Sequence, residues 1–118
     1  MASHNELGKK GEELALAWLV EHGYKILHCN WRYLKYEIDI IASKDEKLQI
    51  IEVKTLQYPM VGNPEDGVTK KKFRFIANAA DEFLNGHPEF RHVQFNILSI
   101  TLHNNKEPEY FLIEDVFY

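Results

Sequence analysis

Two predicted strands within residues 36–55 are joined by a short polar turn, which is typical of a β-hairpin. If Ser43 pairs with Leu48 across that turn, Asp39 lies opposite Glu52. Directly opposed residues have Cβ atoms about 4.5–5.5 Å apart. Because side chains alternate along a strand, one face would then hold four charged residues: Glu37, Asp39, Glu52 and Lys54. The pattern predicts two adjacent carboxylates with a lysine one step along the same face.

Two neighbouring carboxylates repel each other unless a positive charge compensates. Carboxylate oxygens are ligands that Mg²⁺ prefers, and the ion keeps several waters and shares its shell with substrate phosphate. A metal-bound water can lose a proton and attack phosphorus, while the ion neutralises charge on the phosphate oxygens. The ammonium of Lys54 is suited to hold that water and to stabilise the developing charge. Asp39, Glu52 and Lys54 therefore indicate a Mg²⁺ site for phosphodiester hydrolysis, and Mn²⁺ is expected to substitute.

The same hairpin has a simpler interpretation. Its charged residues would form the solvated face of an amphipathic hairpin, stabilised by crossed ion pairs, since charged outer faces are common in antiparallel sheets. The opposite face would be filled by β-branched side chains: Ile38, Ile40, Ile51 and Val53. The spacing alone does not separate these two interpretations.

The chain has 118 residues, a formal net charge of −4 and 45% apolar residues, which predicts one globular domain over residues 1–118. No apolar run approaches the roughly 20 residues of a membrane-spanning helix. The first residues are too rich in charge for a signal peptide, so a cytoplasmic location without membrane contact is expected. The single cysteine, Cys29, excludes an intrachain disulfide and a multi-cysteine metal site. The acidic balance argues against strong non-specific nucleic-acid binding over the whole surface but allows a local basic groove.

Hydrophobic periodicity and turn residues predict two helices and five strands. The expected elements are a helix at 3–22, strands at 24–32, 36–43 and 48–55, a helix at 70–85, and strands at 93–102 and 110–117. Ser3 and Thr69 are the expected helix caps, and Gly8 and Gly11 indicate close packing of the first helix on the sheet. The inward phase of strand 93–102 changes along its length, so that strand is either buried on both faces or bulged. The order α-β-β-β-α-β-β predicts an α/β fold with a mixed β-sheet flanked by helices.

Several motifs extend this interpretation beyond the hairpin. They are Gly8-Lys9-Lys10-Gly11-Glu12-Glu13-Leu14-Ala15, Gly23-Tyr24, Asn30-Trp31-Arg32, Glu37-Ile38-Asp39 and Glu52-Val53-Lys54, followed by Val68-Thr69, Lys72 and Ile113-Glu114-Asp115. Together they resemble the YraN-like family of small bacterial proteins. That family belongs to the PD-(D/E)XK nuclease superfamily and is similar in layout to Holliday-junction resolvases. The resemblance spans nearly the whole chain and implies a restriction-endonuclease-like core.

The resemblance also implies roles for individual residues. Asp39 and Glu52 would be the metal ligands, the backbone carbonyl of Val53 would be a further ligand, and Lys54 would be the catalytic lysine. Glu12 matches the helical acid of the superfamily, which assists from the first helix. On that helix Glu12 lies at the edge of the expected buried stripe, where an ordinary surface glutamate is the alternative.

A basic segment opens the second predicted helix, where cations oppose the helix dipole and a phosphate partner would compensate. The candidates for nucleic-acid binding are Lys70, Lys71, Lys72 and Arg74 on this helix, together with Arg32 and Lys35 in the connection after the first strand. Lys72 matches a lysine of the family, whereas solvated lysines in a polar first turn are the alternative for Lys70 and Lys71. Trp31 either stacks on a base or fills the core.

The leading hypothesis is a metal-dependent endonuclease that hydrolyses DNA phosphodiesters, with branched DNA as a candidate substrate. The first alternative is a catalytically weak nucleic-acid-binding module that retains the nuclease fold. It is favoured by the net charge of −4 and by neutral residues at positions where the family commonly has charged ones: Leu56, Gln94 and Asn96. The second alternative is a protein-interaction domain that docks a partner through aromatic side chains such as Tyr58, Phe117 and Tyr118. A two-fold DNA substrate would require a homodimer.

Overall fold

The structure is a computed structural model that describes residues 4–59 and 70–116. Its elements are α1 (His4–Glu21), β1 (Lys25–Tyr33), β2 (Tyr36–Lys44), β3 (Lys47–Gln57), α2 (Lys70–Asn85), β4 (Val93–Leu102) and β5 (Glu109–Ile113). The predicted order α-β-β-β-α-β-β is confirmed. β5 is shorter than expected, and Asp115 beyond it has a left-handed φ of 58° that does not continue a strand. Phe117, Tyr118 and the expected caps Ser3 and Thr69 lie outside the described residues.

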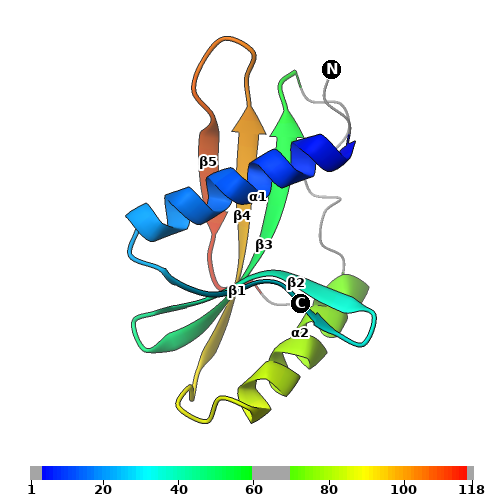
Figure 1. Cartoon of the computed structure of the whole chain (residues 1–118), viewed down its shortest axis with the longest axis vertical. Helices are drawn as coiled ribbons and strands as arrows, with labels where there is room; N and C mark the ends of the chain where they lie inside the picture. Colours follow the sequence, from blue (N-terminus) through cyan, green and yellow to red (C-terminus); the bar gives the residue numbers. More distant parts are fainter. Residues whose placement is uncertain (1–3, 60–69, 117–118) are drawn as a thin grey trace.

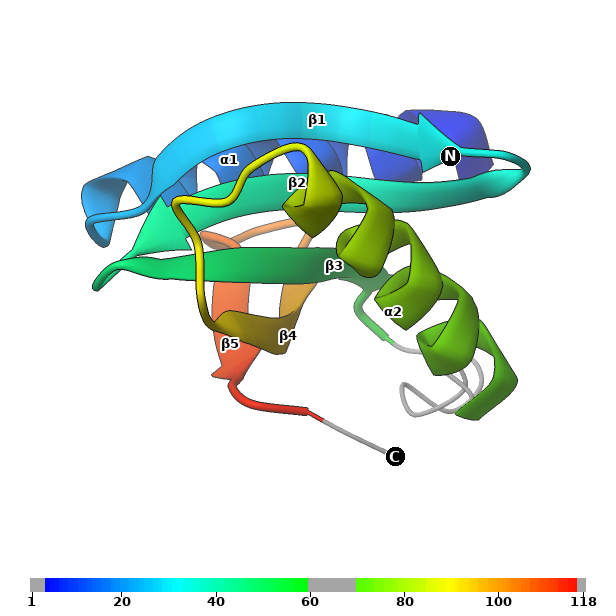
Figure 2. The same cartoon turned by 90° about the horizontal axis from the view of Figure 1, so that it is seen from below.

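The five strands form one mixed sheet in the order β1-β2-β3-β4-β5 (Figure 1). Neighbouring strands are antiparallel except β3 and β4, which are parallel. A parallel pair needs a crossover connection, and α2 lies in that connection. α1 runs across the β3–β5 part of the sheet in Figure 1, and α2 lies toward β1 and β2 in Figure 2. The predicted mixed sheet flanked by helices is therefore confirmed. Neither of these two helices has an apolar stretch long enough to cross a membrane.

Each face of the sheet packs against one helix. On the α1 face, buried Ala15 and Leu19 pack with strand residues that include Ile40, Ala42, Ile51, Leu98 and Ile100. On the α2 face, buried Ile76 and Phe83 pack with strand residues that include Ile38, Ile41, Leu48 and Ile50. The central strands are thus covered on both faces. Polar side chains of these strands can reach solvent only where a helix ends or a strand bends.

β4 contributes to both cores and decides between the two alternatives for that strand. Leu98 and Ile100 belong to the α1 core, whereas Val93 and Phe95 pack against the α2 core. The register between β3 and β4 is uninterrupted from Leu48 to Gln57. The strand is therefore buried on both faces and has no bulge against β3.

The register of the β2–β3 hairpin is as predicted near the turn but stops before all four charged residues, so the predicted direct pairing of Asp39 with Glu52 is not formed. Ser43 pairs with Leu48, and the pairing continues to Ile40 and Ile51. Beyond that point no further pair of the two strands is in register. The turn itself is tighter than expected, because its first and last lysines also pair with each other.

The predicted opposition of Glu37 and Lys54 is wrong. The pairing of β2 with β3 ends at Ile40 and Ile51, before these residues. On its other side, Glu37 is opposite Arg32 of β1. The Arg32 guanidinium lies 3.2 Å from the Glu37 carboxylate. The crossed ion pairs of a simple amphipathic hairpin therefore do not form between Glu37 and Lys54.

α1 approaches β3 so closely that Gly11 has no room for a side chain. A Cβ atom on Gly11 would overlap Oγ1 of Thr55 and would lie 2.8 Å from the Thr55 Cβ. The predicted close packing is confirmed at Gly11 and wrong at Gly8, where an added Cβ would meet nothing within 4 Å. Since Glu12 follows Gly11 directly, this contact holds Glu12 near the sheet.

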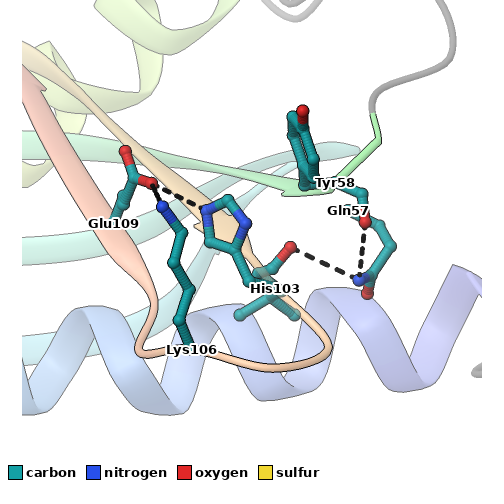
Figure 3. Close-up of polar contacts among 6 residues, drawn as sticks. Gln57, Tyr58, His103, Lys106 and Glu109 are labelled. Atoms are coloured by element: carbon teal, nitrogen blue, oxygen red, sulfur yellow. Dashed lines mark hydrogen bonds and ion pairs between the residues drawn. The ribbon is translucent and has the colours of Figure 1, made fainter.

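A polar cluster connects the ends of β3, β4 and β5 (Figure 3). The His103 side chain is 6% exposed, and its Nε2 lies 2.9 Å from a carboxylate oxygen of Glu109. The same oxygen lies 2.8 Å from Nζ of Lys106. The side-chain amide of Gln57 donates a hydrogen bond to the Leu102 carbonyl at 3.3 Å. The Gln57 bond connects the end of β3 to the end of β4.

Candidate functional site

The alternation of β2 side chains between the two faces of the sheet is interrupted at Asp39. Ile38 and Ile41 both pack in the α2 core, while Ile40 packs in the α1 core. A regular strand places side chains two positions apart on the same face, so the strand must kink between Ile38 and Ile40. The predicted apolar face of the hairpin is therefore wrong for Ile38, which lies on the α2 side. The kink removes Asp39 from the regular alternation of the strand.

The neighbouring strand β1 kinks at the matching position. The rings of His28 and Trp31, three positions apart, both contact the ring of Phe83 on the α2 side. Between them Asn30 has a left-handed φ of 51°. Trp31 fills the α2 core, as one of its two predicted interpretations required. Its indole packs edge-on against Phe83 with ring centroids 5.5 Å apart.

The Asp39 carboxylate occupies the gap that opens between β2 and β3. Its Oδ2 accepts a hydrogen bond from the backbone N–H of Val53 at 2.9 Å. A strand residue directs its N–H and C=O to the same side, so the Val53 carbonyl faces the same gap. A side-chain carboxylate thus replaces a main-chain acceptor at this point. The gap brings together two of the oxygen donors that the resemblance implies.

Glu52 is the one buried acidic residue among the described residues, at 6% exposure. Its Oε1 has no hydrogen-bond partner in the described part of the chain. Burial raises the pKa of Glu52 far above its ordinary value of 4.5, and a hydrogen bond and charge repulsion from Asp39 raise it further. The positive charge of Lys72 opposes this shift. The two carboxyl groups therefore lie together, although not through the predicted pairing of Asp39 with Glu52, and the raised pKa favours the protonated form of Glu52 above pH 4.5.

The C-terminal segment closes a small cavity beside the Glu52 carboxyl. The cavity has a volume of about 10 Å³, and Asn96 and Val116 are among its lining residues. The backbone N–H of Val116 donates to the Phe95 carbonyl at 2.7 Å. The N–H of Asp115 donates to Oδ1 of Asn96 at 3.1 Å. The rest of the lining is apolar, which accounts for the cost of charging Glu52: Ile50, Phe73, Ile76, Phe95 and Ile97.

Glu12 reaches the same site from α1. Burial raises the pKa of Glu12 and the charge of Asp39 raises it further, whereas a hydrogen bond with Asn30 lowers it. The charge of Glu37 adds a smaller upward shift in this pKa. The charge of Asp39 therefore acts on Glu12, whereas the assisting role of Glu12 stays a prediction.

Lys54 lies on the Glu52 side of β3. The register with β4 places Glu52 opposite Ile97 and Lys54 opposite Ser99 without interruption, so both side chains point to the same face. Lys54 is half-buried. Its ammonium makes no hydrogen bond or ion pair with the described residues. The lysine is thus adjacent to the carboxylates and available to another group.

The two predicted basic segments meet across a ring stack, which we name the Lys35–Lys71 ridge. Tyr36 and Phe75 stack with ring centroids 4.2 Å apart. Nζ of Lys35 lies 5.8 Å from the Tyr36 ring centroid, and Nζ of Lys71 lies 5.9 Å from that of Phe75. The turn after β1 and the first turns of α2 therefore place two cations along one edge.

The other predicted basic residues differ in their relation to the carboxylates. Lys72 is close enough for its charge to act on Glu52. Arg32 is exposed and its guanidinium is engaged by Glu37. The remaining two are exposed on α2 and make no contact with the carboxylates in residues 4–59 and 70–116: Lys70 and Arg74.

A sequence profile described as "Uncharacterised protein family UPF0102" matches residues 11–100. The chain belongs to the UPF0102 family. A UPF0102 protein of Phocaeicola vulgatus is 47% identical over 98% of this chain and 93% of its own length. One from Parabacteroides distasonis is 42% identical over 100% of this chain and 97% of its own length. One from Flavobacterium psychrophilum is 39% identical over 100% of this chain and 98% of its own length. The family indicated by the motifs is thus found, while its place in the nuclease superfamily stays a prediction.

Sequence reasoning missed a buried amide network in this UPF0102 chain. Nδ2 of Asn96, a residue 2% exposed, donates to Oε1 of Gln49 at 2.8 Å. The Gln94 amide donates to Oδ1 of Asn96 at 3.0 Å. Polar residues at inward positions of otherwise apolar strands were the available signal. Because the amides satisfy one another, Gln94 and Asn96 bring no net charge to the neighbourhood of Glu52.

The oxygen donors of the UPF0102 site fit a Mg²⁺ ion. The described residues contain no group of three or more His, Cys, Asp and Glu side chains able to hold a metal. Mg²⁺ does not require such a group, because it binds through one or two carboxylates and keeps several waters. Asp39 and Glu52 would supply the carboxylates, and Oε1 of Glu52 could bind the ion without giving up a hydrogen bond to the described residues. The Val53 carbonyl would be the third oxygen donor, since the Val53 N–H faces Asp39.

Glu52→Gln should change how the metal-free UPF0102 protein depends on pH. The folded protein holds the Glu52 proton above the pH at which the unfolded chain releases it, so wild-type stability falls as pH rises beyond about 4.5. The Glu52 carboxyl accounts for a decrease in the free energy of unfolding of up to about 1.4 kcal/mol per pH unit. We expect Glu52→Gln to flatten the decline, measured by thermal unfolding in a chelator from about pH 5 to pH 8.

The matched control is Glu82→Gln, which changes an exposed glutamate of α2. Its unfolding should follow the wild-type pH dependence. Parallel curves for wild type and Glu52→Gln would contradict the raised pKa of Glu52.

Proposed function

We propose that this UPF0102 protein is a Mg²⁺-dependent endonuclease that hydrolyses DNA phosphodiesters, with branched DNA as a candidate substrate. The observation that supports it most is the burial of the Glu52 carboxyl against Asp39, with one of its oxygens unpartnered. A buried pair of this kind is costly unless a cation is part of the functional state. The proposal includes the restriction-endonuclease-like core, a cytoplasmic location and, for a two-fold substrate, a homodimer.

Within the proposal each residue has a distinct task. Asp39, Glu52 and the Val53 carbonyl hold the ion, and Mn²⁺ should replace Mg²⁺ there. Bound Mg²⁺ would act as a Lewis acid on a phosphate oxygen and would lower the pKa of the attacking water. The Lys54 ammonium orients that water and stabilises negative charge on the phosphate oxygens. Glu12 adds a carboxylate on the α1 side of Asp39.

The position of the cations supports a route for the nucleic acid. Lys72 lies near Glu52, and the Lys35–Lys71 ridge is on the neighbouring turns of α2 and β1–β2. A backbone that reaches Lys54 can therefore follow these cations away from the carboxylates. Local positive charge of this kind compensates for a formal net charge of −4 over the whole chain.

A catalytically weak binding module is the second candidate function. It is favoured by the neutral amide network of Asn96, Gln94 and Gln49, which places no charge beside the site. In that case the ion would help to bind phosphate while turnover stayed slow. The cleavage assay below separates the two candidates, because binding and cleavage are measured on the same substrates.

Asp39→Asn and Lys54→Ala should each lower DNA cleavage at least about 100-fold, the usual cost of removing one electrostatic contribution to a transition state. The first change removes a ligand charge, and the second removes the ammonium. The substrates are single-stranded, duplex, flap and four-way DNA with Mg²⁺ or Mn²⁺. DNA affinity of Asp39→Asn should persist or rise, because a negative charge near the phosphates is removed.

The matched controls are Asp45→Asn and Lys47→Ala at the exposed β2–β3 turn, which should cleave like wild type. Equal cleavage by wild type and Asp39→Asn would mean that a contaminant is responsible. DNA binding without cleavage on any substrate would favour the binding module.

Changing Lys35, Lys71 and Lys72 together to Gln should weaken binding similarly for all DNA sequences. The log–log salt dependence should also flatten by about 0.9 for each duplex phosphate that the variant no longer neutralises. The control changes three exposed basic residues away from the carboxylates, with the same reduction in charge: Lys25, Lys47 and Arg91. Salt-dependent binding curves are the measurement, and equally weakened binding by the two triple variants would rule out a localised basic route.

A further inference from the structure

β5 presents two large apolar side chains on the face of the sheet that α1 does not cover. β5 is the last strand of the sheet and pairs with β4 (Figure 1). Tyr110 and Leu112 pack against the α1 core, so Phe111 and Ile113 point to the opposite face. The α2 core lies on that face but includes no described residue of β5. As a result Phe111 is 67% exposed and Ile113 is 42% exposed.

The strand registers place Phe111 in line with Lys54. Lys54 is opposite Ser99 of β4, and Ser99 is opposite Phe111 of β5. The three side chains therefore share the face that also holds Glu52. A single exposed apolar residue is normal on a protein surface. Phe111 differs because its backbone lies two strand spacings, or about 10 Å, from that of the lysine of the proposed site.

The size and charge of this surface favour a nucleotide over a protein partner. A stable protein interface buries about 800 Å² on each partner, more than the two exposed apolar side chains of β5 can supply. The Lys54 ammonium can bind a phosphate oxygen, and the Ser99 hydroxyl beside it can donate a further hydrogen bond. The Glu109 carboxylate, on the same face of β5, is already engaged by Lys106 at 2.8 Å. A phosphate followed by a planar base thus matches the order of cation and ring.

We propose that Phe111 stacks an unpaired base of the DNA strand whose phosphate is bound at Lys54, so that the protein selects DNA in which a strand leaves its duplex. The inference rests on the proposed function for the bound phosphate. The Lys35–Lys71 ridge lies toward β1 and β2, whereas Phe111 lies on the other side of β3. The ridge therefore binds backbone on one side of Lys54, and the ring binds a base on the other. Flap and branched DNA offer such a base, but in a continuous duplex the bases stack on one another.

The stack is tested by DNA binding in Mg²⁺ on an Asp39→Asn background, which keeps the substrate intact. Adding Phe111→Ala should weaken binding of single-stranded and flap DNA about tenfold, within the usual range for one lost base stack, and should leave binding of fully paired duplex unchanged. Phe111→Trp should retain the affinity. Phe111→Leu should not, because it keeps an apolar side chain without an aromatic face. The matched control is Val20→Ala on α1, which removes a side chain that is also largely exposed and should bind every substrate like Asp39→Asn alone.

The position of the base is tested with 2-aminopurine placed at successive positions of the flap strand. On binding, its fluorescence should fall at one position beside the junction, and this decrease should be absent with Phe111→Leu.

The outcomes separate the inference from the proposed function. Unchanged flap binding by Phe111→Ala, or an equal decrease for flap and duplex DNA, would overturn the inference and leave the proposed function standing. A decrease that accompanies a change from dimer to monomer in sedimentation would assign Phe111 to a contact between two copies and would also overturn it. If neither wild type nor Asp39→Asn binds any of the DNA substrates, the proposed function fails and the inference fails with it.

Discussion

Like charges in a buried place repel each other and also lose their hydration, and Asp39 and Glu52 face both costs. The structure lowers them in two ways. Glu52 takes up a proton because burial and Asp39 raise its pKa, and Asp39 accepts the Val53 N–H. Neither adjustment gives Oε1 of Glu52 a partner among the described residues. Under the proposed function a divalent ion would remove this repulsion and displace the proton of Glu52.

The rest of the fold places Asp39 and Glu52 at the edge of the apolar core. The parallel contact of β3 and β4 buries both faces of the central sheet, so a polar opening requires a strand to leave the ladder. β2 leaves at Asp39, and β1 kinks with it at Asn30. α1 then approaches at Gly11 and brings Glu12, while α2 brings Lys72 from the opposite side. The carboxylates therefore lie between the two helix-covered cores.

Much of this arrangement could be predicted from sequence because it depends on short-range rules. Periodicity located every element, and turn length set the hairpin register from Ser43 to Ile40. The kink could not be predicted in this way, because alternation assumes a regular strand. That assumption placed Ile38 on the wrong face and set Glu37 against Lys54, although the pairing of β2 with β3 ends before these residues. The Asn96 network was missed because an amide's partners come from distant strands. Gly8 was wrongly expected to pack closely on the sheet, because a glycine in a helix does not always mark a close contact.

The most direct measurement of the central claim is the number of protons released when the metal binds. Calorimetric titration of Mg²⁺ or Mn²⁺ at neutral pH, repeated in buffers of different ionisation enthalpy, gives that number. If the ion displaces the proton of the buried Glu52, binding should release about one proton per ion. Glu52→Gln should bind weakly and release none. Metal binding without proton release, or no binding at millimolar concentration with and without DNA, would contradict a metal site formed by Asp39 and Glu52.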